Sequence, residues 1–176
     1  MKNIMKMSAI AMALMVGGNA YAEEASATFQ WTGTVTAAPV SGSVKIVNTG
    51  THNFDEGMLT FAESSTVGNY DIASSTQLIF QVQEDTGTVA PTDTLKYEVK
   101  NLKFAAGGGF MTEVDAAAPE FTVVADATTE LDKGSQFDVS LNKDVSLTLT
   151  NKKEIDFVKA GDEVAVQATV LVTHEK

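Results

Sequence analysis

Apolar and polar residues alternate along the stretch from Ala25 to Val35. Its odd positions are apolar or small and include Phe29 and Trp31, whereas its even positions are Ser, Thr or Gln. A period of two is typical of a β-strand with one buried face. Because chain ends are normally frayed and polar, an apolar-faced strand so near the N-terminus requires a covering surface. Either the chain's own core or a groove on another subunit meets that requirement.

The last patterned stretch, from Val164 to Thr173, mirrors the first. Its odd positions mix Ala, Gln, Thr and Leu. Its even positions are all apolar, and they are Val164, Val166, Ala168, Val170 and Val172. Both ends of the chain are therefore predicted to be strands. In a self-sufficient sandwich these two strands pair with each other or lie in opposite sheets.

Most apolar runs between these ends are short, rich in β-branched residues and bounded by turn residues, which is typical of all-β proteins. The predicted strands cover residues 43–47, 58–62, 77–83, 94–100, 120–125, 137–141 and 145–149. Turn sequences separate them, namely Asn48-Thr49-Gly50, Asp85-Thr86-Gly87, Gly107-Gly108-Gly109, Asp132-Lys133-Gly134 and Ala160-Gly161-Asp162. About nine short strands indicate a sandwich of immunoglobulin-like topology, with a closed barrel as the alternative.

The first 22 residues have the pattern of a secretory signal peptide. Lys2 and Lys6 form a basic region around the start of a short apolar run from Ile4 to Val16, and Ala20-Tyr21-Ala22 is a small-x-small cleavage sequence. A retained membrane anchor is disfavoured because the run is shorter than the roughly 20 residues that span a bilayer. We expect a mature chain that begins at Glu23 and is exported through a bacterial periplasm to the cell surface.

Composition narrows the function classes. The mature chain keeps ten lysines, no arginine and 23 acidic residues, so its net charge is near −13. Nucleic acids and anionic membrane surfaces both require clustered cations, so neither is expected as a partner. The chain has no cysteine. Its stability must therefore come from packing and strand pairing, although exported domains often use disulfides.

The opening of the mature chain resembles the subunits of bacterial chaperone-usher fimbriae. Those subunits begin with a short extension followed by an aromatic-x-Gly-x-Val sequence, which here is Trp31-Thr32-Gly33-Thr34-Val35. Many members carry two cysteines where this chain has Val40 and Asp85, so the resemblance is to a cysteine-free branch. The C-terminus also departs from the family, because the segment from Val170 to Lys176 lacks a penultimate tyrosine.

This resemblance implies an immunoglobulin-like pilin domain over residues 35–176 that lacks its final strand. The next subunit's N-terminal extension, residues 23–34, completes it by strand addition. Ala25, Ala27 and Phe29 are then the groove-facing residues of the donated strand, with Trp31 at the hinge. The C-terminal strand lines the groove with Val166, Ala168, Val170 and Val172. The implied partners are further copies of the chain, a periplasmic chaperone, an outer-membrane usher and a possible host receptor.

Residues that carry enzymatic chemistry are sparse. His52 and His174 have no sequence neighbour with which to form a catalytic or metal pair. Ser64-Ser65 and Ser74-Ser75 lack a Gly-x-Ser-x-Gly setting. The three glycines at 107–109 are not followed by Lys and Ser or Thr, so they predict a turn and not a phosphate loop. We expect neither an enzyme nor a bound cofactor.

Two acidic groups are candidate calcium ligands, because Ca²⁺ binds six to eight oxygens in such loops. One group is Asp55-Glu56 and the other comprises Asp126, Glu130 and Asp132. Their spacing matches no calcium-loop motif, so a solvated acidic rim is the preferred interpretation.

The sequence thus predicts a structural subunit of a surface fimbria that polymerises by donor-strand exchange and supports bacterial attachment. A single-domain fimbrial adhesin is one alternative. A monomeric exported immunoglobulin-like binding module that keeps all its strands is the other.

Overall fold

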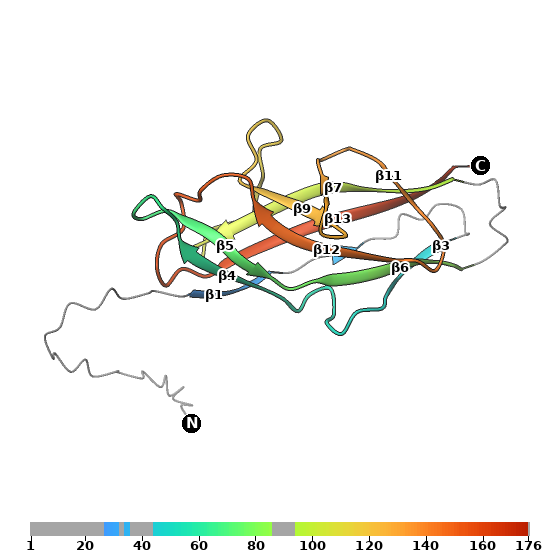
Figure 1. Ribbon diagram of the computed structural model, residues 1–176, viewed down its shortest axis with the longest axis horizontal. Helices are drawn as coiled ribbons and strands as arrows, with labels where there is room; N and C mark the ends of the chain where they lie inside the picture. The colour runs from blue at the N-terminus through green and yellow to red at the C-terminus, as the bar shows by residue number, and fades with distance from the viewer. Residues whose placement is uncertain (1–26, 32–33, 36–43, 86–93, 176) are drawn as a thin grey trace, which may run out of the picture.

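The computed structural model describes residues 27–31, 34–35, 44–85 and 94–175 (Figure 1). In these ranges the chain forms β-strands and no helix. The strands are β1 (Ala27–Trp31), β2 (Thr34–Val35), β3 (Val44–Asn48), β4 (Gly57–Glu63), β5 (Tyr70–Ser75), β6 (Leu78–Glu84), β7 (Thr94–Ala106), β8 (Thr112–Glu113), β9 (Phe121–Ala125), β10 (Thr129–Leu131), β11 (Phe137–Val139), β12 (Asp144–Asn151) and β13 (Val164–Glu175). Within the same ranges there is no helix long and apolar enough to cross a membrane.

The strands form open sheets in an all-β arrangement compatible with a β-sandwich. One sheet has the order β10-β9-β12-β6-β3, a second has the order β11-β7-β13-β2, and a third has the order β1-β4-β5. The short strand β8 pairs with β7. Described pairs are antiparallel except β2 with β13, which is parallel.

The hairpin of β4 and β5 continues the pair of β3 and β6 along the sheet. β6 covers only the first half of β12, from Asp144 to Leu147. Further along β12, the Leu149 N–H donates to Ser75 Oγ of β5 at 2.9 Å. Asn151 accepts from the Ile72 N–H at 2.9 Å through its side-chain oxygen. β3 and β4 therefore lie end to end and occupy one strand position of the sheet. β6 and β5 lie end to end in the next position, beside β12.

The core lies between this extended sheet and the sheet that contains β7 and β13. Phe80 of β6 packs edge-on against Tyr97 of β7, with ring centroids 5.9 Å apart. Phe121 of β9 likewise packs against Phe104 of β7 at 5.6 Å. Offset and edge-to-face contacts of this kind contribute beyond their buried area. The two sheets are thus joined by aromatic side chains along the length of β7.

β7 has thirteen residues because a bulge lets it change which positions face the core. Val170 of β13 pairs with Val99, whereas its neighbour Thr169 pairs with Asn101, so Lys100 is the extra residue. Before the bulge the buried apolar residues are odd-numbered, as at Tyr97 and Val99, and after it Leu102 is buried. A bulge leaves one residue unpaired and bends the strand. The sequence prediction ended this strand at Lys100, where the apolar period changes.

Most predicted strands are confirmed with shifts of one or two residues at their ends. The stretch predicted as one strand from Ala25 to Val35 forms two, β1 and β2, and Ala25 lies outside the described residues. The predicted strand at 137–141 ends at Val139, although Leu141 still bridges to Val82. The sequence prediction missed β5, β8 and β10. Positive φ angles at Gly107, Gly108, Gly134 and Gly161 confirm three of the predicted turns.

The turn between β4 and β5 is held by Glu154 from a distant part of the chain. Its carboxylate accepts hydrogen bonds from Ser65 Oγ and Asn69 Nδ2, both at 3.0 Å. Hydrogen bonding from Thr66, Asn69 and Ser65 lowers the pKa of Glu154 from its ordinary 4.5 to about 2. The ionised carboxylate is therefore the form that fixes this turn.

We expect Glu154→Gln to lower the melting temperature at pH 7, and we expect this loss to become smaller at lower pH. A depressed pKa in the folded state stabilises the fold above about pH 4.5, and this stabilisation is lost as the pH falls toward about 2. The difference between the two proteins should therefore shrink across that window in thermal melts followed by circular dichroism. Glu163→Gln removes the same charge nearby and serves as the control. A difference that stays constant from pH 7 to pH 2 would contradict this role.

Candidate functional site

The apolar stripe of β13 faces the core, as its alternation predicted. Its even-numbered residues are buried with at most 5% exposure, and they are Val164, Val166, Ala168, Val170 and Val172. The odd-numbered residues from Ala165 to Thr173 are only partly buried. Burial of such side chains contributes roughly 1.5–3 kcal/mol for each larger residue. Their placement along the acceptor groove of a pilin stays a prediction.

The two edges of β13 are paired very unequally. On one side β7 pairs with β13 from Val164 to Glu175. On the other side, within the described part of the chain, only Thr169 and Val170 are paired, in parallel with Thr34 and Val35 of β2. A typical hydrogen bond contributes about 0.5–1.5 kcal/mol net, and parallel pairing is slightly less stable per residue than antiparallel pairing. The β2 ladder is therefore a weak attachment.

The N-terminal strands bridge the two sheets of the sandwich. β1 pairs antiparallel with β4, where Ala27 lies opposite Phe61, Phe29 opposite Leu59 and Trp31 opposite Gly57. β1 also lies alongside β13, and β2 then joins the edge of β13. The blue strands of Figure 1 follow this path beside β4 and β13.

The surface beneath these strands is apolar. Leu59 and Phe61 of β4 are 0% and 2% exposed, and the Val170 side chain of β13 is 1% exposed. β4 and β13 thus present apolar side chains on either side of the path of β1 and β2. Of the two covers considered for the N-terminal strand, the structure places the chain's own sheets against it.

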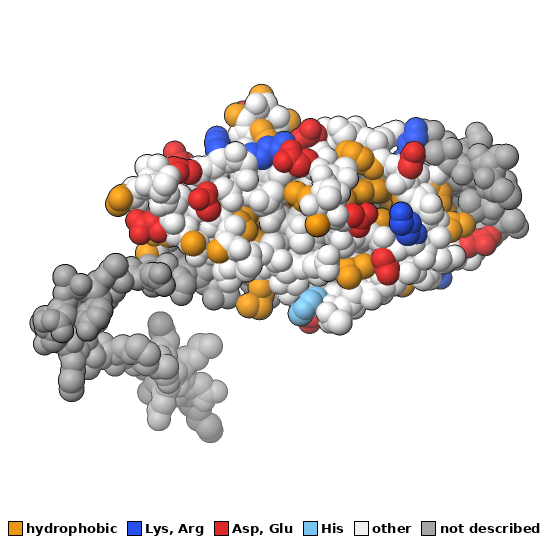
Figure 2. All heavy atoms as spheres, viewed as in Figure 1, with side chains coloured by type: hydrophobic (Ala, Val, Ile, Leu, Met, Phe, Trp, Pro, Cys, Tyr) orange, Lys and Arg blue, Asp and Glu red, His pale blue; other side chains and the backbone are white. Residues whose placement is uncertain are grey.

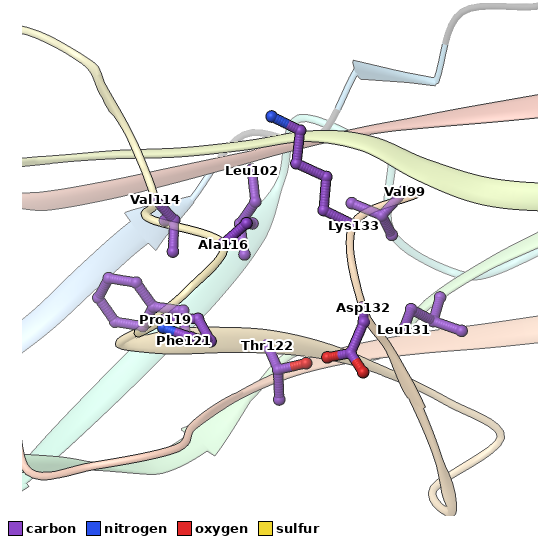
Figure 3. A pocket seen from close by; sticks show the side chains of 10 residues that line it. All are labelled: Val99, Leu102, Val114, Ala116, Pro119, Phe121, Thr122, Leu131, Asp132 and Lys133. Carbon is purple, nitrogen blue, oxygen red and sulfur yellow. The ribbon is translucent and has the colours of Figure 1, made fainter. Parts of the chain in front are cut away.

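One concave feature of the described residues is too small to be a ligand site of ordinary size. It lies between β7, β9 and the segment that follows β8, and its volume is about 80 Å³. Figure 3 shows its lining residues, which are Val99, Leu102, Val114, Ala116, Pro119, Phe121, Thr122, Leu131, Asp132 and Lys133. Pockets for small-molecule ligands usually measure about 300–1,000 Å³. The hollow is therefore a packing feature beside the core.

The candidate calcium ligands are bonded to neighbouring protein groups. Glu130 and Asp132 both form ion pairs with Lys152, at 2.8 and 3.0 Å. The hydrogen bonds that Lys152 donates to these two carboxylates raise its pKa above the usual range. Asp126 accepts hydrogen bonds from the backbone and hydroxyl of Ser146 at 3.0 and 3.2 Å. These acids therefore act as structural links between strands and turns.

The other acidic pair shares a loop with one of the two candidate histidines. Glu56 accepts a hydrogen bond from the Asn53 N–H at 3.1 Å, and this contact lowers its pKa. His52 is exposed in the same loop. Among the residues that the structure describes, no group of three His, Asp or Glu side chains is placed to hold a metal ion.

Of the two positions compared with family cysteines, Asp85 is among the described residues. Val40 lies outside the described residues. Asp85 follows β6 and forms an ion pair with Lys45 of β3 at 3.3 Å. This pair links the ends of neighbouring strands, although two half-exposed charges contribute only about 0–1 kcal/mol.

We expect Val170→Asp to prevent accumulation of the folded protein. The substitution places a carboxylate in an apolar core, which costs several kcal/mol. Thr173→Asp adds the same charge to the partly buried face of β13 and should leave soluble yield nearly unchanged. Soluble yield from expressing cells, measured by immunoblot, checks both. Normal accumulation of Val170→Asp would contradict the burial of this strand.

Comparison of the chain with protein-family models, with curated proteins and with solved structures finds no match. The resemblance to fimbrial subunits therefore stays a prediction from the sequence.

Proposed function

We propose that this protein is the structural subunit of a bacterial surface fimbria, which polymerises by lending its N-terminal strand to another copy. The proposal gives the sandwich an immunoglobulin-like topology that a donated strand completes. It assigns the chain a non-enzymatic role in attachment to surfaces. It also includes export by a signal peptide, a periplasmic chaperone that holds the subunit and an outer-membrane usher that assembles it.

The order of the strands supports this topology. Immunoglobulin-like sandwiches have strands A, B, E and D in one sheet and C, F and G in the other. Here β3 and β4 together take the A position, and β5 and β6 together take the B position. β12 takes the E position and β9 takes the D position. β7 and β13 take the C and F positions. Among the described strands none follows β13 to take the G position.

The observation that carries the proposal is the short ladder that the described residues form at the G position beside β13. A G strand pairs antiparallel along F, whereas β2 runs parallel to β13 and pairs at only Thr169 and Val170. Strand addition to an open edge gains main-chain hydrogen bonds, and alternate side chains fix its register. A strand from another copy that pairs along more of β13 would therefore displace β2.

A monomeric immunoglobulin-like module is the second candidate, and one observation favours it. β1 forms a five-residue ladder with β4 of the same chain, so the N-terminal strand already has a partner. A single-domain fimbrial adhesin fits the same topology, because receptor specificity would reside in loops. The experiment must therefore compare completion by the native N-terminal strand with completion by a strand that can pair along β13.

The test moves the N-terminal strand to the other end of the chain. Residues 23–34 are deleted from the start and fused after Lys176 through a short flexible linker, which lets them run antiparallel along β13. Such a tether supplies the strand at an effective concentration on the order of millimolar. We expect a monomer that melts well above both the intact mature chain and the chain lacking residues 23–34.

The matched control is the same fusion with Phe29→Asp, which keeps the backbone but places a charge at an apolar position of the donated strand. It should lose most of the gain in melting temperature. Calorimetry and sedimentation decide between the candidates. If the intact mature chain is monomeric and has the same melting temperature as the fusion, its fold is already complete. That result would favour the monomeric module.

A further inference from the structure

The segment from β8 to β9 crosses from one sheet to the other and is attached mainly at its two ends. We call residues 112–120 the strap. Near its start, β8 pairs with β7, and the Val114 N–H donates to the Leu102 carbonyl at 2.8 Å. At its end, the Glu120 carbonyl accepts a hydrogen bond from the Lys152 N–H at 2.9 Å. Figure 1 shows this segment as a loop that rises above β9.

An ion pair also lies at each end of the strap. Glu113 pairs with Lys133, and Glu120 pairs with Lys153 at 3.0 Å. In Figure 2 the same region protrudes from the surface, with Lys and acidic side chains side by side at its base. Both lysine side chains are exposed, and water screens such pairs, so they contribute little to stability. Charge therefore attaches the strap only weakly.

Between its ends the strap contacts the core through few side chains. All of its residues are described, and Val114 alone among them is buried, at 6% exposure. Beneath the strap lies the hollow of about 80 Å³, which Val114, Ala116 and Pro119 line from the side of the strap (Figure 3). Protein interiors rarely leave voids larger than a water molecule, and the atoms that line a void lose van der Waals contacts. The strap therefore packs incompletely against the core.

The turn that precedes the strap has the residues of a hinge. Gly107 and Gly108 have φ angles of +59° and +75°, which other residues rarely adopt. Glycine also populates many other backbone conformations at little steric cost, so the chain can rotate at this turn. The strap can thus detach from β7 while Glu120 stays bonded to Lys152 and Lys153.

We propose that the strap opens and closes as a unit while the two sheets stay folded. Local opening occurs where buried apolar contacts are few and hydrogen bonds are exposed. The open form exposes Val99, Leu102 and Phe121, which are at most 8% exposed beneath the closed strap. It also frees the edge of β7 at Lys103 and Phe104, which β8 pairs in the closed form. The strap is thus a removable cover on an edge that is otherwise available for pairing with another chain.

Amide hydrogen exchange of the mature chain, followed by NMR in urea below the unfolding transition, tests this opening. The Val114 amide should exchange on the order of a hundredfold faster than the most protected amides of β12, the central strand of its sheet. Its rate should rise little with urea, because urea sensitivity scales with the surface that an opening exposes. If the Val114 amide and the β12 amides instead exchange alike at every urea concentration, the strap opens only with the whole fold, and the proposal is overturned.

A second experiment fills the hollow from the side of the strap. Ala116→Val adds two carbon atoms at a residue that lines the hollow. Ala117→Val adds the same atoms to an exposed residue that does not line it, and it serves as the control. We expect Ala116→Val to slow exchange of the Val114 amide about tenfold, because the added atoms are buried only in the closed form. The control should exchange as wild type. Equal rates in all three proteins would overturn the role of the hollow in this opening.

Discussion

β13 is the last of the described strands, and the rest of the structure depends on what covers its second edge. One edge is paired with β7 from Val164 to Glu175, and the other has a ladder of two residues with β2. The apolar residues of β13 are buried, so leaving its second edge uncovered would expose the core to water. β1 and β2 meet this need by crossing from β4 to β13. Their attachment is strong toward β4 and weak toward β13.

This imbalance connects the fold to the proposed assembly. β1 pairs with β4 over five residues, whereas β2 pairs with β13 over two. An antiparallel strand that pairs with more of β13 would therefore be a better partner for it. Folding stability and partner concentration are then linked, because a partner that binds only the folded state stabilises it by mass action. With no cysteine in the chain, no disulfide constrains the unfolded state, and strand completion carries correspondingly more of the stability.

The sequence predicted an all-β chain and most of its strands, because alternation over Val164–Thr173 and the short apolar runs reflect burial directly. β5 was missed since Tyr70–Ser75 has no apolar alternation, and its place depends on side chains such as Asn151 from β12. The length of β7 was missed because the bulge at Lys100 breaks the period. The exposure of Phe110 was also missed, since a single Phe in sequence gives no sign of whether it is buried or exposed. The pairing of β1 with β4 depends on contacts between distant residues, which periodicity cannot specify.

The most direct test of the central claim uses Trp31, the only tryptophan of the chain, at the end of β1. A synthetic peptide of residues 23–35 carrying Trp31→Phe is added in excess to the mature protein, and Trp31 emission is followed together with circular dichroism. If the edge of β13 accepts a strand from another molecule, the peptide displaces β1 and β2, and the Trp31 emission changes while the sheet signal is kept. A peptide that also carries Phe29→Asp should have no effect. Unchanged emission with the first peptide would contradict the account, because it would mean that the chain's own strand permanently completes the sandwich.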